Sequence, residues 1–80
     1  MTDNEAIQNI ADRLLDLIET KGINQSDLAR ASGESAMNIS RICRGEVQPK
    51  IGTLTRIAEA LGVSIDYLVG RVEKKSLRTA

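Results

Sequence analysis

Along this 80-residue chain, glycines follow directly after a series of short segments whose apolar residues recur at helical spacing. This pattern limits the fold more than any other feature of the sequence. A glycine directly after a helical run is a common stop signal, because it readily adopts the left-handed conformation that ends many helices. The segments between the stops predict five helices, at about residues 4–20, 25–32, 36–44, 51–61 and 65–69. The pattern therefore predicts an all-α fold, with stops at Gly22, Gly33, Gly45, Gly62 and Gly70.

Polar residues precede the expected helices at positions that suit N-caps. Thr2 followed by Glu5 resembles a capping box. Asn24, Ser35 and Ser64 precede the second, third and fifth helices, and Asp27 suits the positive end of the second helix. Apolar residues of the first helix recur at spacings of three and four, which predicts one buried face made of Ile7, Ile10, Ala11, Leu14, Leu15 and Ile18.

The composition suits one small domain packed from aliphatic side chains. The chain has one tyrosine and neither tryptophan nor phenylalanine, and sheet-rich domains usually draw more on aromatic residues. We expect a domain over residues 1–70, followed by a polar, basic and flexible tail over 71–80. A domain of this size buries little area, so its stability margin should be thin.

The formal charge is zero but unevenly distributed. Residues 1–20 carry a net charge of −4, whereas residues 21–50 and 51–80 each carry +2. A neutral total does not by itself predict nucleic-acid binding, which basic domains favour. The asymmetry indicates that the middle of the chain is better suited than its start to face phosphate.

The residues needed for most catalytic or metal sites are missing. The chain has no histidine, and its one cysteine, Cys43, cannot form an internal disulfide. This composition supplies no usual zinc ligand set and no Cys–His or Ser–His pair, which argues against an enzyme, a metal or another cofactor. A lone cysteine fits a reducing cytoplasm, and we expect Cys43 to be buried. No segment looks like a signal peptide or a membrane span, and no small-molecule site is evident.

The segments 25–32 and 36–44, joined by a tight turn at Gly33, have the layout of a helix-turn-helix. The small Ala29 should let the two helices cross closely. At about 100° per residue, the second helix directs Ile39, Ile42 and Cys43 inward. The same geometry points a second set outward, namely Met37, Ser40, Arg41 and Arg44. Its length of about 13 Å matches the major groove of DNA, about 12 Å wide.

Several motifs together resemble the phage-repressor and Cro-type helix-turn-helix family. They are Q-x-x-L-A-x-x-x-G from Gln25, I-S-R-I-x-R-G from Ile39, Pro49, and A-L-G-V-S-x-D-Y-L from Ala60. The resemblance covers roughly residues 7–70. It implies a five-helix, lambda-repressor-like DNA-binding fold, found mainly in transcriptional repressors and regulators that act as dimers.

The resemblance also implies roles for individual residues. The base-reading positions correspond to Ala36, Met37, Asn38 and Arg41, and the outward Ser40 lies on the same face. Gln25 corresponds to a residue that contacts backbone phosphate, with Asn24 beside it, and Arg44 and the loop through Lys50 correspond to further phosphate contacts. Dimer contacts in such proteins often come from the last helices, which here indicates Tyr67, Val69 and Val72.

Three departures from the family pattern affect this interpretation. Glu34 places a carboxylate in the turn, which is unfavourable near DNA unless it is paired. Lys50 stands where a capping serine or threonine is common. Ala36 and Met37 replace polar residues, which leaves most polar discrimination to Arg41 unless Arg41 is instead paired with a carboxylate such as Glu34.

The sequence thus favours a sequence-specific transcriptional regulator, most simply a repressor that binds a partly palindromic duplex operator as a homodimer. A second hypothesis uses the same fold as a protein-interaction module, either an antitoxin or a subunit of a larger regulator. The zero net charge supports this alternative.

Overall fold

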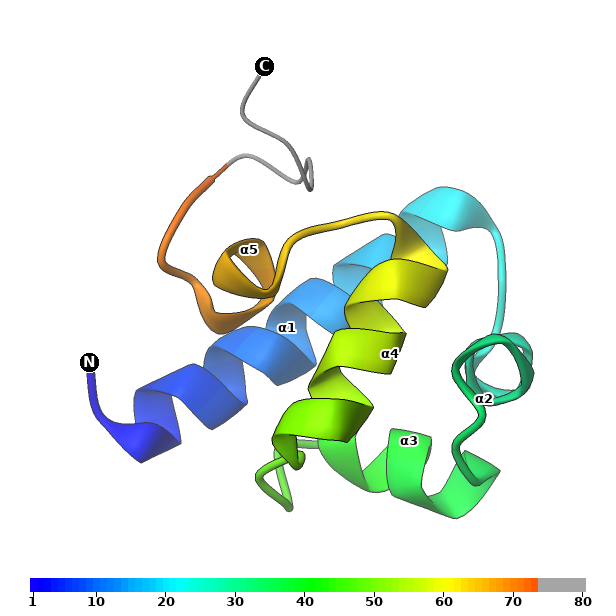
Figure 1. Ribbon diagram of the computed structural model, residues 1–80, viewed down its shortest axis with the longest axis horizontal. Helices are drawn as coiled ribbons and strands as arrows, with labels where there is room; N and C mark the ends of the chain where they lie inside the picture. Colours follow the sequence, from blue (N-terminus) through cyan, green and yellow to red (C-terminus); the bar gives the residue numbers. More distant parts are fainter. Residues whose placement is uncertain (74–80) are drawn as a thin grey trace.

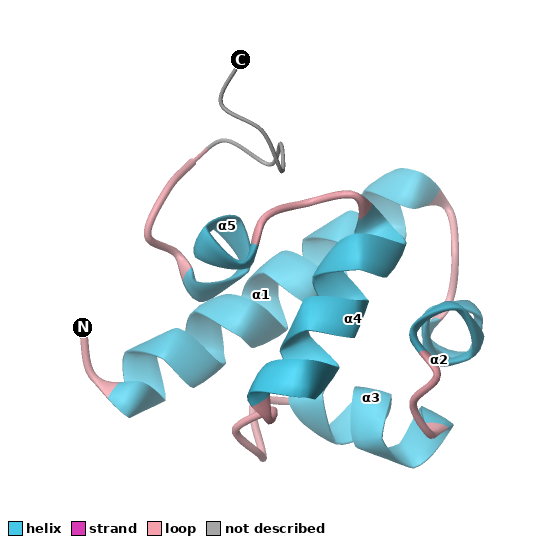
Figure 2. Ribbon diagram, viewed as in Figure 1, coloured by secondary structure: helices cyan, strands magenta, loops and turns pink. Residues whose placement is uncertain are grey.

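The computed structural model describes residues 1–73, and Figures 1 and 2 show this part of the chain as helices joined by short loops, without strands. This confirms the all-α fold and the five expected helices. They are α1 (Asp3–Lys21), α2 (Gln25–Ser32), α3 (Ala36–Cys43), α4 (Ile51–Leu61) and α5 (Ile65–Val69). The bounds match the expected ranges to within a residue; α3 ends at Cys43 rather than Arg44, which is its C-cap.

Side-chain caps begin four of the helices. Thr2 and Glu5 form the expected capping box, and Asn24 and Asp27 form a second one, because Asp27 also accepts the Asn24 backbone N–H at 3.0 Å. The hydroxyls of Ser35 and Ser64 cap α3 and α5, accepting hydrogen bonds from the backbone N–H groups of Asn38 and Tyr67, each at 3.0 Å. Lys50 makes no side-chain cap hydrogen bond, so α4 begins without one.

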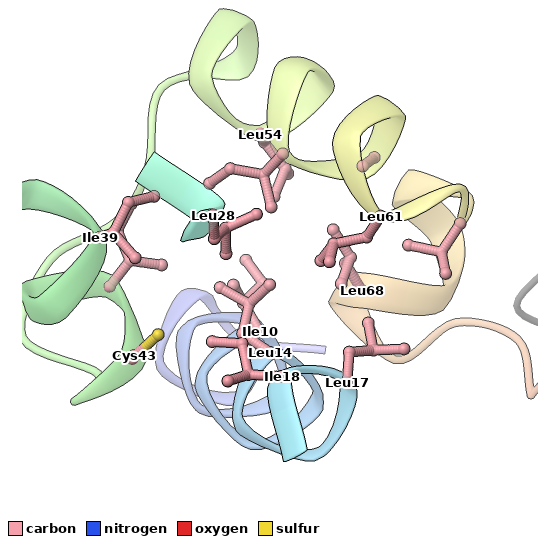
Figure 3. Packing of buried hydrophobic residues seen from close by; sticks show 14 of the residues in the cluster. Ile10, Leu14, Leu17, Ile18, Leu28, Ile39, Cys43, Leu54, Leu61 and Leu68 are labelled. Atoms are coloured by element: carbon pink, nitrogen blue, oxygen red, sulfur yellow. The ribbon is translucent and has the colours of Figure 1, made fainter. Parts of the chain in front are cut away.

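The core is a single aliphatic cluster to which all the helices contribute. Figure 3 shows α1 side chains such as Leu14 facing Leu28 of α2, Leu54 of α4 and Leu68 of α5. Helix α1 packs against α3 and α5, while α2 packs against α4. Cys43 is buried in this cluster, as expected.

The buried face of α1 differs from the expected one at Leu15. Leu15 is 46% exposed, whereas Leu17, outside the predicted set, is 2% exposed. The buried residues centre on Leu14, and at about 100° per residue Leu15 falls at the outer edge of that stripe. Leu17 lies on the side where α5 packs, so the position of that later helix decides which leucine is covered.

Helices α2 and α3 pack against each other and turn at a glycine. Ala29 of α2 is buried in the core, and α2 packs against both α3 and α4. Gly33 has a φ of +73°, and its N–H donates to the carbonyl of Ala29. That left-handed conformation is unfavourable for residues with a Cβ, so the turn requires glycine for backbone reasons. Nothing lies within 4 Å of where a Gly33 Cβ would be.

The chain after α5 returns to the surface of α1. Arg13 donates to the carbonyl of Val72 at 2.9 Å and forms an ion pair with Glu73 at 3.1 Å. The Arg13 guanidinium also lies 4.2 Å from the centre of the Tyr67 ring. Residues 71–73 are thereby held against α1, and the rest of the expected tail, 74–80, lies outside the described residues.

None of the helices in residues 1–73 combines the length and the apolar character needed to cross a lipid bilayer.

Candidate nucleic-acid interface

Helix α3 presents its expected outward face to solvent except at Ser40, which is half-buried. Met37 is 65% exposed, and Ala36, Arg41 and Arg44 are also exposed. Ile39, Ile42 and Cys43 point into the core, where they anchor the helix against α1 and α2. In Figure 1 α3 lies along the lower edge of the molecule, next to the loop that leads into α4. The helix is therefore accessible along the side that carries the candidate base-reading residues.

Arg41 is the unengaged cation of this face. Within residues 1–73 its guanidinium makes neither a hydrogen bond nor an ion pair, and its charge is near enough to Glu46 to contribute to the lowered pKa of that carboxylate. The suggested pairing of Arg41 with Glu34 does not occur, because Glu34 is bound elsewhere. A long, exposed arginine without a partner can reach outward with all its donors available.

Glu34 is held by three side chains that converge on the turn. Arg56 of α4 forms an ion pair with its carboxylate, Thr53 donates to Oε2 at 3.1 Å, and Asn38 donates to Oε1 at 2.8 Å. These hydrogen bonds, chiefly those from Arg56 and Asn38, hold the pKa of Glu34 below its ordinary value. The turn carboxylate is thus compensated within the protein.

Arg56 and Thr53 are functional candidates that sequence reasoning missed. Arg56 also donates from Nε to the carbonyl of Ser32 at 3.1 Å, so it connects α4 to the end of α2. The only sequence signal was Glu34 itself, since a carboxylate in a turn near phosphate needs a cation. Nothing in the spacing of 22 residues identifies Arg56 as that cation.

Arg44 is engaged with a neighbouring carboxylate. Its Nε donates to Glu46 at 2.6 Å, and its Nη1 donates to the Ser40 hydroxyl at 2.6 Å. The pairing raises the pKa of Arg44 and lowers that of Glu46, in both cases mainly through the hydrogen bond between them. Glu46 was not among the predicted site residues, although its position two residues after Arg44 was a usable local signal. Ser40 is half-buried beneath this pair.

The remaining phosphate candidates lie at the starts of α2 and α4. Asn24 uses its side-chain oxygen to cap α2, accepting the Asp27 N–H at 2.8 Å, which leaves its amide N–H groups for other partners. Gln25 is half-buried at the first position of α2. Lys50 is exposed directly before α4.

The three candidate dimer residues differ in how much surface they offer. Tyr67 is 6% exposed and belongs to the core, and Val69 is half-buried against it. Val72 is 40% exposed and so offers the largest apolar surface of the three.

Cys43 lies in the core and not on the outward face of α3. Burial raises the pKa of the Cys43 thiol, which lowers its reactivity. Among residues 1–73 no group of three or more potential metal ligands comes together.

Residues 14–68 match the family model described as helix-turn-helix, a stretch that runs from the middle of α1 to α5. No curated protein and no solved structure matches the chain significantly.

Proposed function

The chain belongs to the phage-repressor and Cro-type helix-turn-helix family of DNA-binding transcription regulators, and we propose that it is a repressor that binds its operator as a dimer with α3 in the major groove. The observation that carries this proposal is the outward face of α3, where an unengaged Arg41 stands beside the exposed Ala36 and Met37. Repression is the simplest outcome, because occupying a promoter blocks it without further activity.

Base reading is assigned to the exposed side of α3. A guanidinium donates two hydrogen bonds to O6 and N7 of guanine, a pair of acceptors that no other base presents in the major groove. Arg41 therefore reads a guanine. Met37 lacks a donor and contacts a thymine methyl group instead, and Ala36 contributes shape. Ser40 is half-buried and its hydroxyl accepts from Arg44, so its proposed polar contact to a base requires that hydroxyl to donate outward.

Phosphate contacts are assigned to residues at the edges of that face. Arg44 and Lys50 supply positive charge, and Asn24 and Gln25 supply amide N–H donors at the start of α2. Such contacts fix the register of a protein on DNA without reading its sequence. They also make the affinity fall as salt is added, because each neutralised phosphate releases counterions.

Dimerisation is supported by the size of the reading surface. One short helix covers only a few base pairs, so two copies on a partly palindromic site are needed for specificity. Val72 and Val69 near the end of the fold are the proposed contacts, while the third candidate, Tyr67, is buried in the core and offers little surface to a partner. This patch is small, so the free protein should dimerise weakly.

Selection of bound duplexes from a random DNA library tests this function. We expect enrichment of a site with two related half-sites, and an affinity that falls steeply with salt concentration. Binding that is equally weak on every duplex, with no enriched site, would contradict the proposal. That result would favour the protein-interaction module that the zero net charge also permits.

A further inference from the structure

We propose that Glu34 is a positioning residue that sets the base preference of Asn38, by fixing which end of the Asn38 amide faces the DNA. This inference rests on the proposed function, because it concerns how α3 reads bases. It assigns a role to a carboxylate that the family pattern does not have at this position and that would otherwise repel DNA.

The hydrogen bond between the two side chains determines the orientation of the amide. Asn38 Nδ2 lies 2.8 Å from Glu34 Oε1. An ionised carboxylate only accepts hydrogen bonds. A glutamate with an ordinary pKa of 4.5 is ionised at neutral pH, and the pKa of Glu34 lies below that value. The nitrogen end of the amide must therefore face Glu34, and Oδ1 must face away from it. The usual ambiguity between the two ends of an asparagine amide does not arise here.

Glu34 is itself held firmly enough to impose this orientation. Its side chain is 13% exposed, and the ion pair with Arg56 comes from α4, a separate helix of the core. Thr53, which is buried, donates to the same carboxylate oxygen that Arg56 binds, leaving Oε1 for Asn38. The carboxylate thus links α4 through the turn to the start of α3.

The fixed amide has a definite chemical preference. Asn38 presents Oδ1 as an acceptor, together with the one N–H that Glu34 does not use. That combination matches adenine, which offers the N6 amino group as a donor and N7 as an acceptor. A reversed amide would present two N–H donors, which suit O6 and N7 of guanine. Glu34 therefore favours adenine over guanine at the base opposite Asn38.

The test compares base preference in the full chain at each position of the selected operator. Glu34→Gln removes the acceptor-only partner, because glutamine can accept from or donate to Asn38. We expect the preference for adenine over guanine at one position per half-site to fall about tenfold, while the guanine read by Arg41 stays preferred. Glu59→Gln makes the same chemical change on the exposed side of α4 and should leave all preferences as they are.

A double-mutant cycle separates positioning from a general structural effect. In an Asn38→Ala background, Glu34→Gln should change the preference at that position no further. If Glu34→Gln does not fold at the assay temperature, Arg56→Gln carries the same test, since it keeps the carboxylate but removes the residue that holds it. It too should weaken the adenine preference at the same position.

The experiments distinguish a failure of the proposed function from a failure of the role assigned to Glu34. A wild-type chain that enriches no DNA site contradicts the proposed function, and the role of Glu34 falls with it. A wild-type chain that enriches a site, while Glu34→Gln and Arg56→Gln keep every base preference unchanged or weaken all positions equally, overturns the role of Glu34 alone.

Discussion

The two arginines of α3 and its C-cap, Arg41 and Arg44, differ in the partners that their guanidinium groups already have within the protein. Arg44 is bound to Glu46 and Ser40, whereas Arg41 makes no hydrogen bond or ion pair among residues 1–73 and acts on Glu46 only through its charge. Both arginines are exposed, and an exposed ion pair in water contributes little to stability. Arg44 can therefore exchange the Glu46 carboxylate for a phosphate at small cost, and Glu46 competes with DNA for it.

Glu46→Gln should accordingly raise the affinity for duplex DNA by a few-fold. The increase should be similar for cognate and random sequences, because phosphate contacts carry no sequence information. The salt dependence should also become steeper, since one more positive charge is available to displace counterions. Titration of labelled duplexes at several salt concentrations measures both effects. Weaker binding by the variant would show that Glu46 supports the interface instead of competing with it.

For individual residues, the direction of a side chain could be predicted from the sequence, whereas its partner could not. The outward direction of Met37 and Arg41 follows from helix periodicity and was predictable. The pairing of Glu34 with Arg56 was not, because it depends on how α4 packs beside the turn, 22 residues away. Periodicity tells which way a side chain points, but its partner depends on the tertiary arrangement.

At the scale of elements, the crossing of α2 and α3 positions the recognition surface. Ala29→Leu should overpack this crossing and lower the free energy of unfolding by about 1–3 kcal/mol. In a domain this small, such a loss is a large share of the total stability. Thermal melting measures it, and Ala31→Leu is the matched control, because Ala31 is exposed on the same helix. An Ala29→Leu melt equal to that of the wild type would show that the helices do not pack closely there.

The ion pair between Glu34 in the turn and Arg56 of α4 should make the stability of the fold depend on pH in the acidic range. The pKa of Glu34 is lowered in the folded state from an ordinary value of 4.5. The pairing therefore stabilises the fold fully above about pH 4.5 and is lost as the pH falls through the lowered pKa. We expect the melting temperature of the wild type to decrease on acidification below that pH. The melting temperature of the Glu34→Gln variant should decrease less over the same pH range. Glu5 and Glu46 have lowered pKa values too, so some acid sensitivity should remain in the variant.

Helix bounds were predictable because caps and glycine stops are local signals. Thr2, Asn24, Ser35 and Ser64 cap the helices that they precede in the sequence. The face of α1 was predicted less well: Leu15 is exposed and Leu17 buried, because α5 determines that edge of the core. A local pattern thus defines where a helix begins and ends, while its exact buried face depends on later helices.

At the scale of the whole molecule, the proposed operator complex contains two chains. Two recognition helices on one face of the duplex should lie about 34 Å apart, one helical turn of DNA. Sedimentation of the protein with its selected duplex should therefore give two chains per site, and the site should show two half-sites at that spacing. One chain on an asymmetric site would contradict dimeric binding while leaving the fold unaffected.

The most direct test of the central claim, that α3 reads bases, is competition binding with all four bases at every operator position, for the wild type and Arg41→Ala. The variant should lose about 1–3 kcal/mol on the cognate site and its preference for guanine at one base pair per half-site, with a much smaller loss on random DNA. An equal loss of affinity for every duplex would make Arg41 a phosphate or structural residue and would contradict base reading by this helix.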